Sequence, residues 1–188
     1  MTDWPSAFRL RWVANLLRQG GVVGYPTEAV YGLGCDPLNA DAFQRLLAIK
    51  NRPLHKGVIL IAAEFSQLTP FIRPLPPAME QQAHNDWPGP VTWLLPARAE
   101  VPDYLTGGRD TVATRVTDHP IAAALCRAFG GALVSTSANH SGFAPARSAL
   151  RTRLLFGDRL DYVLGGATGG LERPTPIRDG RTGKYLRT

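Results

Sequence analysis

Apolar residues recur at helical spacing in the first segment of the chain. Four of them fall on one face of an α-helix: Leu10, Val13, Ala14 and Leu17. Ser6 or Asp3 can cap the start of this helix, and Gly20 and Gly21 end it. The pattern predicts an amphipathic helix that packs its apolar face on a core.

Uninterrupted apolar runs then alternate with helical patterns. Such runs are typical of strands that are covered on both faces. The predicted strands are 22–25, 58–62, 91–95, 112–116, 132–135 and 162–164. The predicted helices are one that Asn39 caps and Pro53 closes, and stretches near 64–69, 77–86, 120–129 and 147–155. Residues 27–39 are predicted as a loop, and 175–188 as a loop with one short final strand. The alternation predicts an α/β domain with a central sheet.

Composition favours one compact domain over residues 1–188. The chain has 44% apolar and 19% charged residues, so it can bury a core and is neither a disordered tail nor a coiled coil. It has no run of about 18 apolar residues, and Asp3 precedes any hydrophobic stretch, so we expect no membrane partner and no secretion. Cys35 and Cys126 lack CxxC spacing, which favours a cytoplasmic protein.

Basic residues are concentrated near the C-terminus. The formal net charge is +6, and residues 147–188 hold nine basic and four acidic side chains. This asymmetry suits a polyanionic partner, although the codon preference of a GC-rich genome explains an arginine excess equally well. The cluster of Arg147, Arg151, Arg153 and Arg159 therefore has two interpretations, an RNA-phosphate surface and a solvated helix face.

Several common sites are absent from the sequence. It contains no GxxxxGK[ST], GxGxxG or GxSxG motif. Its four histidines never pair at metal-ligand spacing: His55, His84, His119 and His140. No protein-held metal is therefore predicted. His119 precedes Pro120 and a predicted helix, and we expect it to be a capping or surface residue.

Four polar segments could carry chemistry, and each also has a structural explanation. Residues 24–34 place a hydroxyl, a carboxylate and a phenol after a strand, where α/β sheets bind ligands, but they also fit a glycine-rich turn. Lys50 and Arg52 put two cations at a helix end, which the helix dipole alone favours. Residues 135–142 supply hydroxyls and amides that bind phosphate or form turns. Arg115 lies within a strand and needs an anion, either a ligand or a structural carboxylate.

These motifs occur together and in a fixed order. PTEAVYGLG, the KxR of Lys50 and Arg52, WPGPVT, TVATRVTDHP and STSANxSG closely resemble the motifs of the TsaC/YrdC family, the L-threonylcarbamoyladenylate synthases. The resemblance spans about residues 7–188 and is closest to the short, single-domain bacterial form. It implies a YrdC-like α/β fold with a twisted mixed sheet flanked by helices and a concave basic face.

The resemblance implies a reaction. L-Threonine, bicarbonate or CO2, and ATP give threonylcarbamoyl-AMP and pyrophosphate, the first step of a threonylcarbamoyladenosine modification of tRNA. Magnesium is expected to arrive with ATP, because no carboxylate cage is visible in the sequence. The implied partners are tRNA and transfer proteins of the TsaB, TsaD and TsaE type.

The resemblance also assigns site residues. Lys50 and Arg52 match the catalytic cations at the ATP phosphates. Thr27, Tyr31 and Arg115 match threonine-binding positions, with the guanidinium on the carboxylate. The implied ATP-binding residues are Lys50, Arg52, Thr111, Ser135, Ser137, Asn139 and Arg187.

One segment departs from the family pattern, and two other functions compete. Residues 174–179 lack the usual family residues, although Thr175 keeps a hydroxyl there. The main alternative is a non-catalytic protein that binds structured RNA, but the chain has no RNP-type motif or GXXG clamp. The other is a carbamoyl-adenylate-forming domain like that of hydrogenase maturation proteins, whose usual companion domains are missing here.

Overall fold

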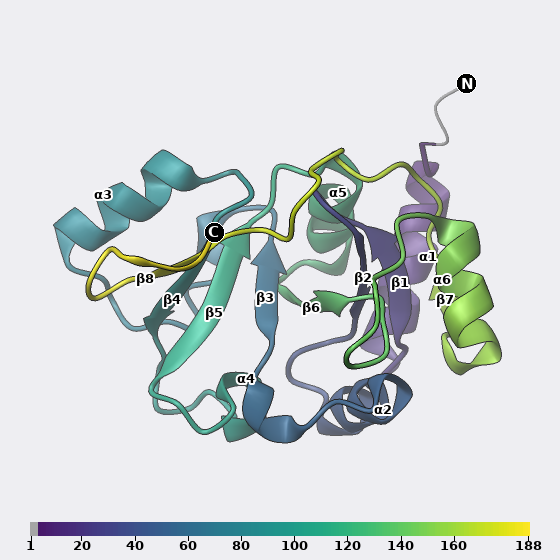
Figure 1. Cartoon of the computed structure of the whole chain (residues 1–188), viewed down its shortest axis with the longest axis horizontal. Helices are drawn as coiled ribbons and strands as arrows, with labels where there is room; N and C mark the ends of the chain where they lie inside the picture. Colours follow the sequence, from purple (N-terminus) through teal and green to yellow (C-terminus); the bar gives the residue numbers. More distant parts are fainter. Residues whose placement is uncertain (1–3) are drawn as a thin grey trace.

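The computed structural model describes residues 4–188, and these residues contain one nine-stranded sheet. The strand order is β7-β1-β2-β6-β3-β5-β4-β8-β9 (Figure 1). The strands are β1 (Val23–Pro26), β2 (Tyr31–Gly34), β3 (Ile59–Ala62), β4 (Thr92–Pro96), β5 (Thr111–Val116), β6 (Leu133–Ser137), β7 (Tyr162–Val163), β8 (Ile177–Asp179) and β9 (Tyr185–Arg187). Three neighbouring pairs are parallel, β1 with β7, β3 with β5 and β4 with β8, and the others are antiparallel. The mixed α/β sheet predicted from the sequence is confirmed.

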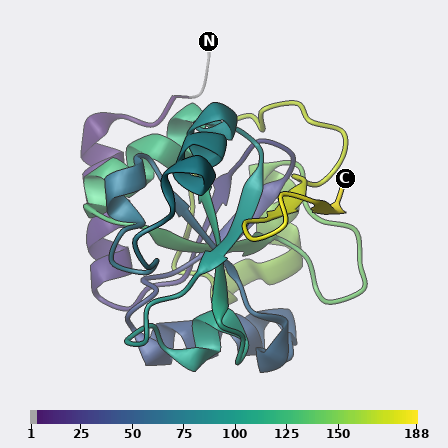
Figure 2. The ribbon, with the colours of Figure 1, turned by 90° about the vertical axis from the view of Figure 1, so that its left-hand side faces the viewer.

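Helices flank this twisted sheet (Figure 2). They are α1 (Ala7–Arg18), α2 (Ala40–Lys50), α3 (Pro77–Asp86), α4 (Asp103–Thr106), α5 (Pro120–Phe129) and α6 (Ala149–Phe156), with short 3-10 turns at Leu54–Lys56, Phe65–Gln67 and Gly157–Arg159. Ser6 caps α1 by accepting a hydrogen bond from the Arg9 N–H, whereas Asp3 lies outside the described residues. The predictions at 77–86 and 120–129 match α3 and α5 residue for residue.

The two faces of the sheet bury separate apolar clusters. Alternate residues of a strand point to opposite faces, so Leu60 packs in the cluster that contains α2, whereas Ile61 packs in the cluster that contains α1 and α5. Helix α5 covers only part of this second face. Leu133 and Ile61 are fully buried there, whereas Ile59, two residues earlier on β3, is partly exposed. The uncovered part of the face is where a ligand can reach the strands.

Two sequence predictions were wrong about local structure. The loop predicted at 27–39 contains β2, which pairs with both β1 and β6. Its two glycines and its lack of a β-branched run hid the strand, which tertiary pairing creates. The helix predicted at 64–69 is only a 3-10 turn, Phe65–Gln67. Strand β8 and the single turn α4 were also missed, because both are too short to show a period.

His119 is a cap but not a surface residue. Its side chain accepts a hydrogen bond from the Ala122 N–H at the start of α5, and it is only 4% exposed. Its Nε2 also lies 3.0 Å from the carbonyl oxygen of Ala167. Burial lowers the pKa of the imidazole below its ordinary value.

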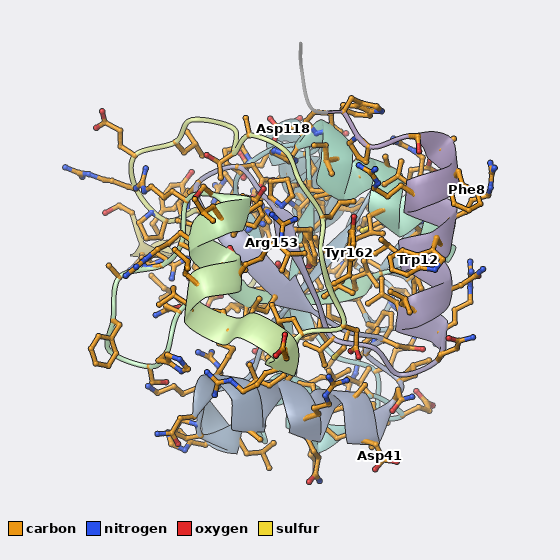
Figure 3. All side chains as sticks on the ribbon, turned by 90° about the vertical axis from the view of Figure 1, so that its right-hand side faces the viewer. Phe8, Trp12, Asp41, Asp118, Arg153 and Tyr162 are labelled. Carbon is orange, nitrogen blue, oxygen red and sulfur yellow. The ribbon has the colours of Figure 1, made fainter. Side chains whose placement is uncertain are left out.

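The edge strand β7 is covered on its flanks. Figure 3 shows Tyr162 between α1 and α6, with Trp12 beside it, and the two rings meet edge to face at 5.0 Å. Arg153 of α6 donates to the carbonyl oxygen of Val163 at 3.0 Å. This contact satisfies an acceptor that an edge strand would otherwise expose. Among residues 4–188, no helix is long and apolar enough to cross a membrane.

Gly34 lets β2 approach its neighbours closely, which predicts a stability effect. A Cβ at Gly34 would lie 2.2 Å from the carbonyl oxygen of Val134 and 2.8 Å from the hydroxyl of Tyr25. We expect Gly34→Ala to lower the free energy of unfolding by about 2 kcal/mol, because backbone must move to admit the methyl group. Urea unfolding measures the change. The control is Gly131→Ala, whose Cβ would make only ordinary contacts, at 3.7 Å and beyond. Equal stability of both variants would contradict the explanation.

Candidate functional site

Two adjoining pockets occupy the uncovered face of the sheet. The first has a volume of about 320 Å³ and the second about 360 Å³. They share four lining residues: Arg52, Ile59, Ser135 and Arg187. Two pockets joined through cationic side chains can hold two substrates with an anionic group between them.

The structure brings the predicted site residues together, with one exception. The first pocket is lined by Thr27, Tyr31, Arg52, Arg115, Ser135, Ser137, Asn139 and Arg187. The second adds Thr111. Lys50 lines neither pocket. The described lining of both pockets contains no Asp or Glu, so an anion there meets no carboxylate in the wall.

Arg52 reaches both pockets because α2 ends just before it. Asn51 adopts a left-handed conformation with φ of 50° as the C-cap, and the chain then turns toward the sheet. The Arg52 guanidinium donates to the carbonyl oxygen of Gly57 at 2.9 Å, but its buried Nε has no hydrogen-bond partner among the described residues. Burial lowers its pKa. Arg52 therefore has a donor left for a ligand.

Arg115 is buried in β5 and held on several sides. It donates to Glu28 at 3.0 Å, and both side chains are 4% exposed. It also donates to the hydroxyls of Thr92 at 3.2 Å and Thr175 at 2.9 Å. Its Nε is buried and has no partner among the described residues. The structural carboxylate that the sequence left as one alternative is therefore Glu28, and Arg115 itself lines the first pocket.

Arg187 brings a third guanidinium from the last strand, β9. It donates to the carbonyl oxygen of Thr175 at 3.1 Å. Burial, and then the positive charge of Arg115, lower its pKa. Three guanidinium groups from three distant parts of the chain thus face the same pocket.

Lys50 supports the site from below instead of lining it. It is 2% exposed, and its Nζ donates to the carbonyl oxygens of Ser137 and Asn139. Burial, and then the charge of Arg52, lower the pKa of its amine from 10.5 to about 7. The spacing of Lys50 and Arg52 suggested two equivalent cations. In the structure the α2 terminus directs one side chain under the 137–139 turn and the other into the pockets.

The turn that Lys50 supports is also closed by its own side chains. The hydroxyl of Ser137 donates to Oδ1 of Asn139 at 2.6 Å, and Nδ2 of Asn139 donates to the carbonyl oxygen of Phe143 at 2.7 Å. Both residues still line the first pocket. The segment therefore forms the turn of the structural interpretation, and its role in binding stays a prediction.

Some residues at the site were not found from the sequence. Glu28 was noted only as a carboxylate in a turn, and Lys56 and Arg109 line the second pocket without having been singled out. Lys56 follows Arg52 by four residues, but Pro53 separates the two and they share no helix that would have linked them. Pairings between distant segments leave no local pattern.

The C-terminal arginine cluster is mostly bound to its own chain. Arg147 donates to the carbonyl oxygens of Leu171 and Glu172, and Arg159 to that of Leu155. Arg153 donates to Val163, as described above. These contacts give three of the four arginines a structural role.

The described residues offer no metal site of their own. No group of three or more His, Cys, Asp or Glu side chains in residues 4–188 could hold a metal ion. The Glu28 carboxylate, which is paired with Arg115, already accepts hydrogen bonds from Arg115 and Thr117.

Fold and site together define a class of protein: an α/β domain with arginine-lined pockets, suited to small anionic molecules, on a mixed sheet. The sequence model of the Sua5/YciO/YrdC family, described as "Telomere recombination", matches residues 15–188. The chain belongs to this family.

Similar proteins cover almost the whole chain. A threonylcarbamoyl-AMP synthase of Halorhodospira halophila is 62% identical over 96% of this chain and 94% of its own length. A threonylcarbamoyl-AMP synthase of Cellvibrio japonicus is 52% identical over 100% of this chain and 99% of its own length.

Solved structures show the same fold. YciO of E. coli has a TM-score of 0.86 at 28% identity and covers 99% of this chain and 91% of its own. P. abyssi Sua5 complexed with L-threonine has a TM-score of 0.88 at 33% identity over 93% of this chain. The chain spans about half of the Sua5 length, 51% in that structure.

The position of Lys50 predicts a pH dependence of stability. Its folded pKa of about 7 lies below the ordinary 10.5, so the unfolded state binds more protons between these values. The contribution of Lys50 to the free energy of unfolding is therefore largest above about pH 10.5, and it is lost as the pH falls through about 7. We expect the free energy of unfolding of the wild type, relative to Lys50→Met, to rise between pH 7 and 10 in urea titrations.

The control for this prediction is Lys184→Met, at an exposed position of the last turn. Its difference from the wild type should not change with pH. A flat or falling difference for Lys50→Met would show that the carbonyl acceptors keep Lys50 protonated.

Proposed function

We propose that this chain is a threonylcarbamoyl-AMP synthase. It combines L-threonine, bicarbonate or CO2, and ATP into threonylcarbamoyl-AMP and pyrophosphate. The observation that carries the proposal is the 62% identity to a curated synthase over 96% of the chain. The three arginines that line one pocket supply the charge that this chemistry needs.

The reaction needs no nucleophilic side chain from the protein. The amine of threonine attacks the carbon of CO2 and releases a proton to solvent, or attacks bicarbonate and expels water; either route gives a carbamate. The carbamate oxygen then attacks the α-phosphorus of ATP, and pyrophosphate leaves. The protein supplies positioning and positive charge, which are the main contributions in phosphoryl transfer.

The pockets suggest how the substrates divide between them. Arg115 and Thr27 hold threonine at one end of the first pocket, with the guanidinium on the carboxylate. Arg52 and Arg187 line both pockets and contact the phosphates. The nucleotide extends from Ser137 and Asn139 toward Thr111.

Lys50 acts in this proposal through the turn that it supports. By binding the carbonyl oxygens of Ser137 and Asn139, it fixes two residues of the ATP site. We expect magnesium to enter with ATP, whose phosphates would hold the ion.

The product is a reactive mixed anhydride, so a second protein must use it. We place this chain in the cytoplasm, with tRNA as the final acceptor and transfer proteins of the TsaB, TsaD and TsaE type as downstream partners. The chemistry of the product supports a transfer step after this reaction, because the product carries an activated acyl group.

The direct test is pyrophosphate release by the purified protein with ATP, magnesium and bicarbonate, each amino acid being added in turn. We expect release only with threonine or close analogues. Arg52→Ala should lower the rate about 30- to 1000-fold, because it removes a charge from the phosphate site.

The matched control is Arg11→Ala, which removes an exposed arginine from α1 and should leave the rate unchanged. Pyrophosphate release that does not depend on the amino acid would refute the synthase. Activity of Arg52→Ala at a tenth of the wild-type rate or more would refute its phosphate role.

Arg115→Lys separates the two substrates. Lysine cannot reproduce the two-pronged guanidinium contact, so the KM for threonine should rise about tenfold or more while that for ATP changes little. Initial rates with each substrate varied at saturation of the other measure both constants. If the two constants rise equally, Arg115 has only a structural role in β5.

A further inference from the structure

Glu28 is a buried carboxylate next to the pocket that does not line it. It is 3% exposed, and its two oxygens have different partners. Oε2 accepts from the guanidinium of Arg115 at 3.0 Å, and Oε1 accepts from the hydroxyl of Thr117 at 2.6 Å. Both oxygens are thus satisfied within the protein, and the side chain cannot turn without losing one contact.

Residues 165–175, which we call the crossing segment, are attached to the same place. The carbonyl oxygens of Thr27 and Glu28 accept hydrogen bonds from the N–H groups of Gly169 and Leu171, at 3.0 and 3.1 Å. A Cβ at Gly169 would lie 3.0 Å from Cα of Glu28, so only glycine allows this approach without a shift. In Figure 1 this segment passes over the top of the molecule before it enters β8.

The crossing segment then returns to Arg115, which closes a ring of contacts. Its last residue, Thr175, accepts from the Arg115 guanidinium at 2.9 Å through its side-chain oxygen. Glu28 therefore binds the crossing segment through its backbone carbonyl oxygen, and it binds Arg115 through its side-chain carboxylate. A displacement of any one of the three moves the other two.

This ring decides which part of Arg115 faces a ligand. Thr92 and Thr175 accept from one terminal nitrogen, and Glu28 accepts from the other. The buried Nε remains without a partner among the described residues, and Arg115 lines the first pocket. Hydrogen bonds on these sides hold the guanidinium in one orientation beside the pocket, and a fixed orientation is what a two-point contact with a carboxylate needs.

We propose that Glu28 is a positioning residue for threonine binding: it holds Arg115 and the crossing segment in register so that Arg115 meets the substrate carboxylate. The inference rests on the proposed function. Glu28 itself touches no substrate. Its loss lets the guanidinium turn away and frees Thr175, and the affinity for threonine falls while that for ATP does not.

Steady-state pyrophosphate release by the full chain tests this, with threonine and ATP varied separately. For Glu28→Ala we expect the threonine KM to rise about tenfold or more, the range for losing the charge-assisted hydrogen bond between Arg115 and the threonine carboxylate. The ATP KM should stay within about threefold of the wild-type value. Glu28→Gln keeps an acceptor of the same shape without the charge, so its threonine KM should fall between those of the wild type and Glu28→Ala.

The matched control is Asp86→Asn. Asp86 forms another partly buried ion pair, with Arg178 at 3.1 Å, and neither residue lines the two pockets. This variant loses the same kind of charge, so it should change stability without a change in the ratio of the two KM values. Urea unfolding of all variants separates loss of fold from loss of binding.

The outcomes are distinct. No threonine-dependent pyrophosphate from the wild type would overturn the proposed function and the inference with it. An active wild type with threonine and ATP constants that rise equally, or stay unchanged, in the Glu28 variants would overturn the positioning role alone. If Glu28→Ala does not fold, Glu28→Gln decides: a threonine KM raised about threefold with an unchanged ATP KM supports the role.

Discussion

The buried guanidinium of Arg115 constrains more of this structure than any other single group. A charge in the interior of a strand is costly unless it is paired and hydrogen-bonded. Its three partners come from the β1–β2 turn, from β4 and from the segment before β8: Glu28, Thr92 and Thr175. The terminal nitrogens of Arg115 find their hydrogen-bond acceptors only when these distant segments are assembled around β5. The buried charge is therefore stable only in the fully folded arrangement.

The site arises because one face of the sheet is incompletely covered. Helices α1 and α5 bury the part that contains Ile61 and Leu133, and leave the part around Ile59 and Ser135 open. The C-terminal hairpin β8–β9 extends this open region and brings Arg187 to it. The polar strand residues there remain accessible to a ligand because no helix packs on them.

Electrostatics explains why the open face suits an anionic substrate. Arg52 and Arg187 lie where burial lowers the pKa of each, so the charged forms are less well solvated than in water. An anion placed between them restores that lost solvation. Glu28 balances Arg115 from behind, and it does so without contributing a carboxylate to the pocket wall.

The sequence alone was sufficient for the elements with a clear period and for the composition of the site. The helices predicted near 77–86 and 120–129 coincide with α3 and α5, and each begins at a proline, a residue that favours the first turn of a helix. The residues that the resemblance assigned line the two pockets, Lys50 excepted, whereas Lys56 and Arg109 line the second pocket without having been assigned. The sequence also indicated that Arg115 needs an anion.

Only the tertiary structure decided the rest. Strand β2 exists because β1 and β6 pair with it, and Arg52 reaches the pockets because the C-cap at Asn51 redirects the chain after α2. Lys50, the last residue of α2, lies under the 137–139 turn. The Glu28 and Arg115 contact joins residues 87 positions apart. Local pattern reports which face of an element is buried, but it holds no information on which distant group will meet that face, and this meeting is what converts a set of polar residues into a site.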